Sequence, residues 1–315
     1  YSSAASDVYK RQDLYGSIQK KAEFYEVCEK FGIPYPDSKI LSAPVDATEL
    51  TEDKLGFAYP IIVKPSSSVD YWKHPFDTMK KVYTAATPAE AAEIVKTIYA
   101  SGYPDRMVLQ KMVPGGDDHM RVLTAFSDEN GKVRAMCLGH TMVEEHTPHG
   151  LGNPAAIVSE DTASLPLVEN IRKMLEACHY TGFSNFDIKY SGTPGDYRVF
   201  EINLRQGRSS YYVTAAGYNL AKWLVDDVIY HKDMPCTVAT NKVLWTIIPE
   251  KIIFQYVKSE SAKAEARALI KAGKVCHSYY YEGDRSLKRW VHYKKNQFHY
   301  FEKYKRYFGN KGLRD

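Results

Sequence analysis

Acidic and amide side chains recur at two-residue spacing in a predicted β-hairpin near the middle of the chain. Its strands cover residues 182–190 and 197–205, and a glycine- and proline-containing turn joins them. Side chains alternate between the two faces of a strand, so Glu201, Asn203 and Arg205 are predicted to share one face. The opposite face is predicted to enter a core with Phe200, Ile202 and Leu204.

The same hairpin brings two carboxylates together. A turn centred on Pro194 sets Asp187 opposite Glu201, with Cβ atoms about 4.5–5.5 Å apart. Two such carboxylates repel, and the pKa of one rises unless a cation lies between them. Mg²⁺ meets that need, because it binds carboxylate oxygens together with nucleotide phosphates. Asn203 adds a neutral oxygen, and Arg205 adds a guanidinium suited to phosphate. A surface hairpin with ordinary ion pairs is the alternative, and the Glu-x-Asn-x-Arg spacing favours the metal.

Two upstream lysines could neutralise bound phosphates. Lys64 ends the apolar run 59–63, where burying an unpaired ammonium is costly, so it needs an anionic partner or an exposed strand end. Lys21 lies in a predicted amphipathic helix, next to Lys20. The serine run 66–68 follows Lys64, and its hydroxyls and amides could cap phosphates.

The elements around these residues mix strands and helices, which predicts an α+β (mixed α/β) fold rather than a doubly wound parallel sheet. Apolar patterns predict strands at 59–64, 107–113, 119–126 and 132–141, with a hairpin turn at 128–131. Helices are predicted at 14–31, 87–99, 162–178, 209–230 and 260–272. Thr87 begins the second of these helices with a capping box.

Composition limits the class of protein. The 315 residues are 44% hydrophobic and 25% charged, as in ordinary globular proteins, and no apolar run approaches a membrane span. Five cysteines without a CxxC pair predict reduced thiols in a cytoplasmic protein. Residues 1–12 resemble translated adapter sequence and are interpreted as a non-native leader.

The C-terminal segment is basic and aromatic. From 286 to 315 there are nine Lys or Arg against two acids, interleaved with eight aromatic residues. One interpretation is docking to an anionic partner, including peripheral contact with a membrane surface. The other is a lysine-rich amphipathic helix that packs on the rest of the protein. No nucleic-acid partner is expected.

The motifs together resemble the ATP-grasp superfamily, which includes biotin carboxylase, carbamoyl-phosphate synthetase and D-alanine–D-alanine ligase. Phe-Glu-Ile-Asn-Leu-Arg, ending at Arg205, is similar to the metal-binding strand of these enzymes. The resemblance implies that Asp187, Glu201 and Asn203 hold Mg²⁺, with Mn²⁺ as an alternative, on the phosphates of ATP. It also implies that Arg205 steadies the activated carboxylate or the transferring phosphoryl group.

Two further motifs resemble the nucleotide-binding residues of the family. Tyr-Pro-Ile-Ile-Val-Lys, ending at Lys64, is similar to the family's phosphate-contacting strand, and Lys21 is similar to its earlier lysine. Ser67 lies where relatives have a flexible phosphate-covering loop, although that loop is often glycine-rich in the family.

Residues 109–116 resemble the hinge strand between the two ATP-grasp lobes. The resemblance implies that Gln110, Lys111, Met112 and Val113 border the adenine, which backbone groups usually read. Family members commonly have glutamate where Lys111 stands.

Three acidic or basic residues follow this hinge. Asp117 or Asp118 is expected to accept the ribose hydroxyls, and Asp118 is the preferred candidate. Arg121 is expected near the phosphates or the acid substrate. His146 and His149 lack an evident third metal ligand, so a polar loop is the simpler interpretation.

Residues 117–157 resemble a narrower group, the bacterial carboxylate–amine ligases that couple D-aspartate to a peptidoglycan precursor. The resemblance covers about residues 20–230. It implies ATP, a small carboxylic acid such as D-aspartate and an amine acceptor, which could be a cell-wall precursor, as partners. It also implies two α+β lobes gripping ATP, at 13–112 and 113–235, with a C-terminal subdomain at 236–315.

Two other functions stay open at this point. One is an ATP-grasp phosphotransferase or carbamoyl-phosphate-type synthetase that uses no amine acceptor. The other is a non-catalytic anion-binding protein with a degenerate nucleotide site, against which the intact acid, amide and arginine set argues.

Overall fold

The computed structural model describes residues 18–147, 150–161, 165–280 and 283–309. The proposed leader 1–12 and His149 therefore lie outside the described residues. The chain divides into two compact units. The smaller contains residues 18–114 and 189–202, and the larger contains 115–188 and 203–309.

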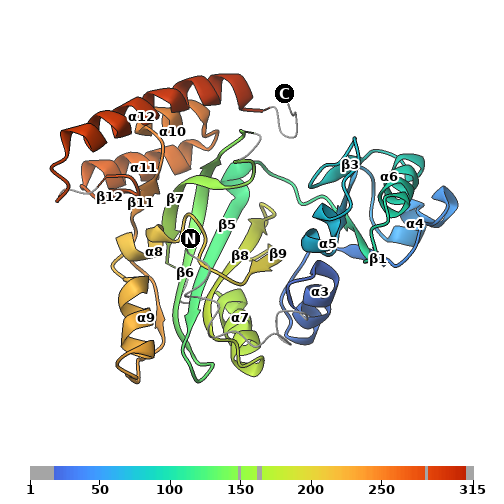
Figure 1. Ribbon diagram of the computed structural model, residues 1–315, viewed down its shortest axis with the longest axis horizontal. Coiled ribbons are helices and arrows are strands. Elements are labelled where there is room, and N and C mark those ends of the chain that lie inside the picture. The colour runs from blue at the N-terminus through green and yellow to red at the C-terminus, as the bar shows by residue number, and fades with distance from the viewer. Residues whose placement is uncertain (1–17, 148–149, 162–164, 281–282, 310–315) are drawn as a thin grey trace. The chain divides into compact units, whose positions relative to one another are not determined.

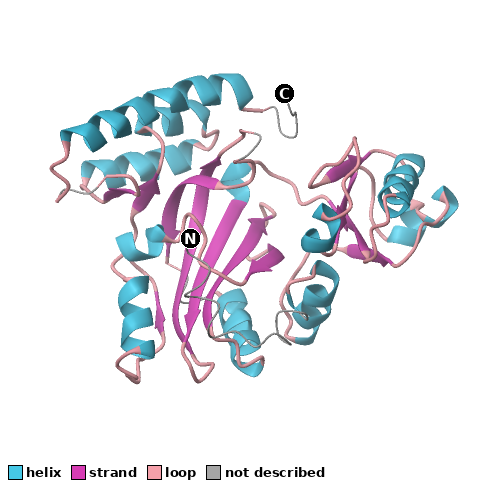
Figure 2. Ribbon diagram, in the orientation of Figure 1, coloured by secondary structure: helices cyan, strands magenta, loops and turns pink. Residues whose placement is uncertain are grey.

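The smaller unit has a four-stranded antiparallel sheet in the order β1-β4-β2-β3 (Figures 1 and 2). Its strands are β1 (Ser38–Leu41), β2 (Ile61–Pro65), β3 (Tyr83–Ala85) and β4 (Met107–Lys111). Its helices are α3 (Lys21–Lys30), η1 (Ala47–Glu49), α4 (Glu52–Leu55), α5 (Ser68–Trp72) and α6 (Pro88–Ala100). The strands predicted at 59–64 and 107–113 are thus present, with shifted ends.

The capping box predicted at Thr87 begins α6. The Thr87 side chain accepts a hydrogen bond from Glu90 N, and the Glu90 carboxylate accepts one from Ala86 N. The Thr87 cap therefore satisfies the amide of Glu90 in the first turn, where Pro88 has no N–H to satisfy. The helix places Ala91, Val95 and Ile98 in the core of this unit.

The larger sheet of the described residues has eight strands. Seven follow the order β12-β11-β7-β6-β5-β8-β9, and β10 pairs with β6. The strands are β5 (Met120–Ser127), β6 (Val133–Glu144), β7 (Pro154–Glu160), β8 (Gly182–Tyr190), β9 (Tyr197–Asn203), β10 (Thr237–Val238), β11 (Leu244–Thr246) and β12 (Val275–His277). Figure 1 shows β6 in the middle of this sheet, between β5 and β7. Antiparallel pairs dominate, which confirms the α+β class.

The hairpin turn predicted at 128–131 joins β5 to β6. Asp128 N donates to Lys132 O at 2.9 Å, and the Asp128 carboxylate accepts from Asn130 N and Lys132 N. Gly131 has φ of 72°, and a Cβ there would lie 2.9 Å from His179 Cα. Only glycine fits this left-handed position without displacing the neighbouring chain.

The helices of the larger unit are η2 (Asp117–His119), α7 (Pro166–Ala177), α8 (Tyr211–Ala215), α9 (Leu220–Val228), α10 (Glu250–Tyr256), α11 (Glu260–Lys271) and α12 (Leu287–Tyr307). The single helix predicted at 209–230 was wrong, because Gly217 has φ of 101° and follows the end of α8. Asn219 then caps α9 by accepting a hydrogen bond from Lys222 N. One amphipathic pattern therefore covers two short helices.

The C-terminal helix packs on the core of this unit, as one of the two interpretations of the basic segment predicts. Tyr300 and Tyr304 of α12 are buried in the cluster that contains Trp245 of β11 and Ile253 of α10. Gln297 Nε2 donates to Ile247 O at 2.9 Å, and Tyr304 Oη donates to Glu144 O at 2.8 Å. In the part of the chain that the structure describes, no helix has the length and apolar character required to cross a bilayer.

Candidate active site

Two lysines of the smaller unit are buried among polar partners. Lys64 is 7% exposed at the end of β2, and its Nζ donates to Gln110 Oε1 at 2.9 Å and to Tyr25 Oη at 3.2 Å. Its ammonium also lies 5.4 Å from the centre of the Phe200 ring. Gln110 Nε2 in turn donates to Tyr25 Oη at 2.9 Å. The ammonium of Lys64 is therefore positioned by a network rather than extended into solvent.

Lys21 begins α3 and is 9% exposed. Its Nζ lies 3.1 Å from Glu201 Oε2 and 3.3 Å from Ser68 Oγ. Lys21 and Glu201, which the sequence assigns to phosphate and metal binding, are thus direct neighbours within one unit. The pairing gives the buried Lys21 ammonium and the partly buried Glu201 carboxylate partners of opposite sign.

The Glu201 carboxylate is held ionised. Burial by itself would raise its pKa, but the positive charges of Lys21, Lys81 and Lys64 outweigh burial and lower the pKa to about 2. The three lysines outnumber the single Glu201 carboxylate, so the region around it is positively charged. Such a region attracts polyanions such as nucleotide phosphates.

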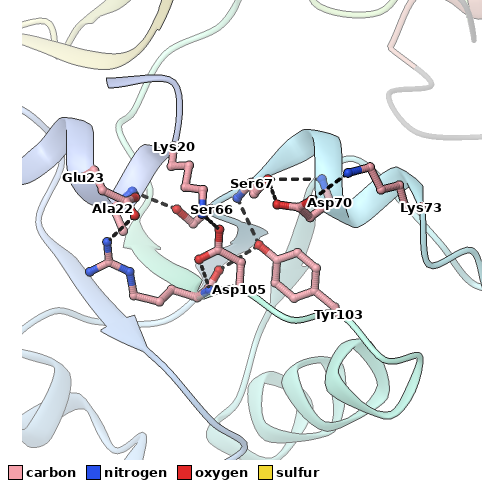
Figure 3. Close-up of polar contacts among 10 residues, drawn as sticks. Lys20, Ala22, Glu23, Ser66, Ser67, Asp70, Lys73, Tyr103 and Asp105 are labelled. Atoms are coloured by element: carbon pink, nitrogen blue, oxygen red, sulfur yellow. Dashed lines mark hydrogen bonds and ion pairs between the residues drawn. The ribbon is translucent and has the colours of Figure 1, made fainter. Parts of the chain in front are cut away.

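The serine run is folded into an ordered turn (Figure 3). Ser66 Oγ accepts a hydrogen bond from Ala22 N at 3.0 Å, and Ser67 N donates to Tyr103 Oη at 3.0 Å. The Ser67 hydroxyl caps α5 by accepting from Asp70 N and donates to the Asp70 carboxylate at 2.8 Å. Ser67 therefore positions the start of α5, and Ser68 is the serine whose hydroxyl contacts Lys21.

Two ion pairs link α3 and its N-cap Lys20 to residues 105–106, which precede β4. Lys20 Nζ lies 2.7 Å from Asp105 Oδ2, and both residues are labelled in Figure 3. Arg106 pairs with Glu23 at 2.8 Å. Ser66 N donates to Arg106 O at 2.9 Å. Lys20 and Lys21 are adjacent in sequence, and only Lys21 reaches Glu201.

The predicted hinge residues have different environments. Gln110 is paired on both sides within the sheet, with Ser38 of β1 and Ile62 of β2, and its side chain contacts Lys64. Lys111 N donates to Asp37 O at 2.9 Å, and Lys111 Nζ pairs with the Asp37 carboxylate. Met112 and Val113 come after the end of β4.

In the larger unit, Asp187 and Asn203 are in contact. Asn203 Nδ2 donates to Asp187 Oδ2 at 3.3 Å, from the last residue of β9 to β8. A carboxylate beside an amide matches the oxygen ligands that Mg²⁺ takes, and rotation of the Asn203 amide would present its oxygen to an ion. Among the described residues, no group of three His, Cys, Asp or Glu side chains could hold a metal. The predicted ligands Asp187, Glu201 and Asn203 include only two acidic side chains, so they would not form a group of that kind.

The strand that carries Glu201 departs from strict alternation. Val199 and Ile202 are buried, whereas Phe200 is only partly buried. Val199 N donates to Pro34 O at 2.8 Å, and Phe200 O accepts from Tyr25 Oη at 2.9 Å. The prediction that Phe200 enters the core was wrong, because its ring is partly buried beneath the Lys64 ammonium and its carbonyl oxygen accepts from Tyr25.

Arg205 lies after the end of β9 and is exposed. Its Nη1 donates to Gln206 O at 3.0 Å, and its carbonyl oxygen accepts from Asn185 Nδ2 at 3.2 Å. Asn185 is 4% exposed and also exchanges hydrogen bonds with Thr124 and Ser210. Sequence reasoning missed Asn185, although it shares the two-residue spacing of Asp187 on β8. It also missed Tyr25, which has no motif around it.

Arg121 is buried in a second polar cluster. Its Nε lies 3.1 Å from Glu160 Oε2, and its Nη1 donates to Asp118 O at 3.2 Å. His140 Nε2 is 2.6 Å from the same Asp118 oxygen. Burial, helped by the charge of Arg121, lowers the pKa of His140 to about 3, so that the ring is neutral. Arg121 and His140 therefore fix the backbone at Asp118.

Asp117 and Asp118 line a cavity of about 310 Å³ with Met142, Val143, Tyr256, Lys258 and Phe308. The Asp117 carboxylate lies 2.7 Å from His146 Nε2, and Gly309 N donates to His146 Nδ1 at 2.9 Å. The His146 ring stacks on Phe308 with centroids 4.4 Å apart. These contacts give His146 a structural role between the Asp117 turn and the end of α12.

Comparison with known proteins places the chain in a family. No family model matches it. The chain is 38% identical over 300 residues to D-aspartate ligase of Enterococcus faecium (strain Aus0004), which covers 94% of this chain and 71% of that protein.

Solved structures with 12–16% identity share the fold. The biotin carboxylase domain of Hydrogenobacter thermophilus 2-oxoglutarate carboxylase, in complex with MgADP, ADP and bicarbonate, has a TM-score of 0.55 over 74% of this chain and 50% of that chain. N5-carboxyaminoimidazole ribonucleotide synthetase from Thermus thermophilus has a TM-score of 0.54 over 75% of this chain and 59% of that chain. This chain thus spans about half of the first of these proteins and about three fifths of the second. The structures support the ATP-grasp fold, and the 38% identity shows that the chain belongs to the D-aspartate ligase family of carboxylate–amine ligases.

Proposed function

We propose that this chain uses Mg²⁺-ATP to phosphorylate the carboxylate of an amino acid and then joins the resulting acyl phosphate to an amine. The observation that carries the proposal is the cluster of Lys21, Lys64 and Glu201 within one unit, where two buried ammonium groups accompany an ionised carboxylate. Phosphoryl transfer needs such positioned charges and no protein nucleophile.

In the first step an oxygen of the substrate carboxylate attacks the γ-phosphorus of ATP, and the bond to ADP breaks. Lys64 and Lys21 would neutralise the charge on the phosphate oxygens during this transfer. The network of Gln110 and Tyr25 fixes the Lys64 ammonium, so little reorganisation is required when the nucleotide binds. The Ser66–Ser68 turn supplies amides and hydroxyls next to Lys21.

Asp187, Glu201 and Asn203 are the residues that would hold Mg²⁺. The contact between Asp187 and Asn203, and the ionised state of Glu201, fit the oxygen ligands that this ion takes. When bound, the ion would neutralise charge on the β- and γ-phosphate oxygens. Before it binds, Lys21 balances the charge of Glu201.

In the second step the amine nitrogen attacks the acyl carbon, phosphate leaves with the electron pair of the broken bond, and the nitrogen loses a proton. We assign Arg205 to the tetrahedral intermediate, because its guanidinium follows directly on the metal-binding strand. Asn185 supports this role by holding the Arg205 carbonyl oxygen. Arg121, by contrast, is assigned to positioning Asp118.

For the substrates, we propose D-aspartate as the acid and an amine of a cell-wall precursor as the acceptor. The name of the 38% identical relative supports the acid. We also propose lobes at 13–112 and 113–235 with a C-terminal subdomain at 236–315; the boundary between units at Pro114 and Gly115 supports the first division. Five free thiols agree with a reducing, cytoplasmic location.

The test is ADP release by the purified chain with Mg²⁺-ATP, D-aspartate and a precursor peptide, with each component omitted in turn. The proposal predicts release that needs both acid and amine, together with one new amide per ADP in the mass spectrum. Equal release without any amine would favour the phosphotransferase or carbamoyl-phosphate alternative. Binding of nucleotide without turnover would favour the anion-binding alternative.

A further inference from the structure

The outward face of α12 combines apolar and basic side chains. Leu287, Val291 and Phe298 are 73%, 53% and 76% exposed. Their spacing of four and seven residues places them on one side of a helix. This face is opposite to the one that packs on the core through Tyr300 and Tyr304. Large apolar side chains with this exposure and alignment are unusual for a face that meets only water.

Basic residues flank this apolar stripe. The helix Leu287–Tyr307 has seven Lys or Arg and one acid, Glu302. Exposed Lys294 and Lys295 lie between Val291 and Phe298, and exposed Lys305 lies further along the same side. Figure 1 shows α12 as one long uninterrupted helix, so a single element carries both the stripe and its charges.

We propose that this outward face of α12 docks the protein onto an anionic lipid bilayer. A helix lying in a bilayer interface has Lys and Arg that contact headgroups and Leu, Val, Phe or Trp that enter the acyl boundary. Trp290, which is 49% exposed beside this stripe, is a residue type that favours that depth. The proposal concerns binding at a surface and is independent of the ligase reaction.

Two other occupants fit the same face less well. A second copy of α12 would oppose lysines to lysines across the contact, which is unfavourable. A nucleic acid would satisfy the lysines, but its phosphodiester backbone gives no burial to Leu287, Val291 and Phe298. A bilayer with anionic headgroups is the partner that satisfies both kinds of side chain.

The side of α12 that faces the protein is already occupied. Gln297 and Tyr304 donate hydrogen bonds to the backbone of the larger unit at 2.9 and 2.8 Å. Docking therefore requires no release of α12 from the core. Substitutions on the outward face should also leave the fold intact, because those side chains are mostly exposed.

The experiment is co-sedimentation of the intact chain with vesicles of phosphatidylcholine alone or of phosphatidylcholine mixed with phosphatidylglycerol. We expect binding to the mixed vesicles, and we expect it to weaken as salt is raised. Val291→Ser combined with Phe298→Ser should weaken binding by at least about tenfold. Lys294→Glu combined with Lys295→Glu should weaken it by at least about tenfold as well, since each lysine near the surface contributes about fivefold.

Matched controls lie elsewhere on the larger unit. Ile229→Ser removes an apolar side chain that is 62% exposed outside α12, and Lys271→Glu with Lys274→Glu reverses two exposed charges near the end of α11. These variants should bind vesicles like the parent, and circular dichroism should show all variants folded. Equal binding to both vesicle types, or unchanged binding of the α12 variants, would overturn the proposal. The proposal would also be overturned if the parent did not bind vesicles but bound DNA or itself, and the α12 variants lost that binding.

Discussion

Lys21 Nζ lies 3.1 Å from Glu201 Oε2, which joins the first described helix of the smaller unit to the strand that carries the Glu-x-Asn-x-Arg motif. The lysine is 9% exposed. Of the three lysines whose charges lower the pKa of Glu201 to about 2, Lys21 has the largest effect. The sequence assigns Glu201 to the metal and Lys21 to the phosphates, and in the structure these two residues form one ion pair. Metal binding at Glu201 would share the carboxylate with Lys21 or release that lysine toward phosphate.

Replacing Lys64 should abolish most turnover. Lys64→Met removes the ammonium that Gln110 and Tyr25 position, so we expect ADP release to fall by at least about a hundredfold. Lys39→Met, at an exposed position on β1, is the control and should retain parental activity. Steady-state ADP release measures both. Parental activity in Lys64→Met would remove this residue from the proposed phosphate site.

Replacing Glu201 should alter the metal requirement. Glu201→Gln keeps the shape of the side chain but loses the charge, so the Mg²⁺ concentration that gives half-maximal ADP release should rise by at least about tenfold. The unpaired Lys21 should also cost about 1–3 kcal/mol of unfolding free energy. Urea unfolding separates the two effects.

The control for Glu201 is an acid in an exposed ion pair. Glu49 pairs with Lys54 at 2.8 Å and is 59% exposed, so Glu49→Gln should change neither the metal requirement nor stability measurably. A parental Mg²⁺ requirement in Glu201→Gln would show that this carboxylate is not a metal ligand.

The sequence predicted much of this architecture where a local rule applies. The capping box at Thr87 and the turn at Asp128 are contained within a few residues, and both are present. The helix interrupted at Gly217 and the position of Phe200 were mispredicted, because a backbone break and contacts with distant residues decided them.

For the site, motif spacing singled out Lys21, Lys64 and Glu201 but could not show which residues contact them. Tyr25 and Asn185 were missed, since their roles come from tertiary hydrogen bonds to Lys64 and to the Arg205 carbonyl. Contacts of this kind bring together residues far apart in the chain. They become visible only once the strands and helices are placed.

Asn185 should support both stability and the second step. Asn185→Ala removes hydrogen bonds to Thr124, Ser210 and the Arg205 carbonyl from a buried position, so unfolding free energy should fall by about 1–3 kcal/mol. We expect kcat to fall while the Mg²⁺ requirement stays at the parental value. Asn296→Ala, at an exposed position of α12, is the control. A stability equal to that of the parent would contradict this role.

His140 should make stability depend on pH. Its pKa is lowered to about 3 in the folded protein by burial and by Arg121, whereas an unfolded histidine has a pKa of about 6.5. The unfolded state therefore binds one more proton below about pH 6.5, and this residue's stabilising contribution is lost as pH falls through that window. The expected slope is about 1.4 kcal/mol of unfolding free energy per pH unit.

His140→Gln should remove that slope, because glutamine can still donate to Asp118 O and carries no titrating ring. His299→Gln, at an exposed position of α12, should keep it. Urea unfolding at several pH values between about 6.5 and 5 measures the difference. Parallel pH dependences for the parent and His140→Gln would contradict the buried neutral state.

The most direct test of the acyl-phosphate route is oxygen transfer from the acid to phosphate. The chain is supplied with Mg²⁺-ATP, an amine acceptor and D-aspartate labelled with ¹⁸O in its carboxylates, and the released phosphate is analysed by mass spectrometry. Because a carboxylate oxygen attacks phosphorus and the amine then expels phosphate, each released phosphate should contain one ¹⁸O atom, and Lys64→Met should release little of it. Unlabelled phosphate accompanying amide formation would contradict the account.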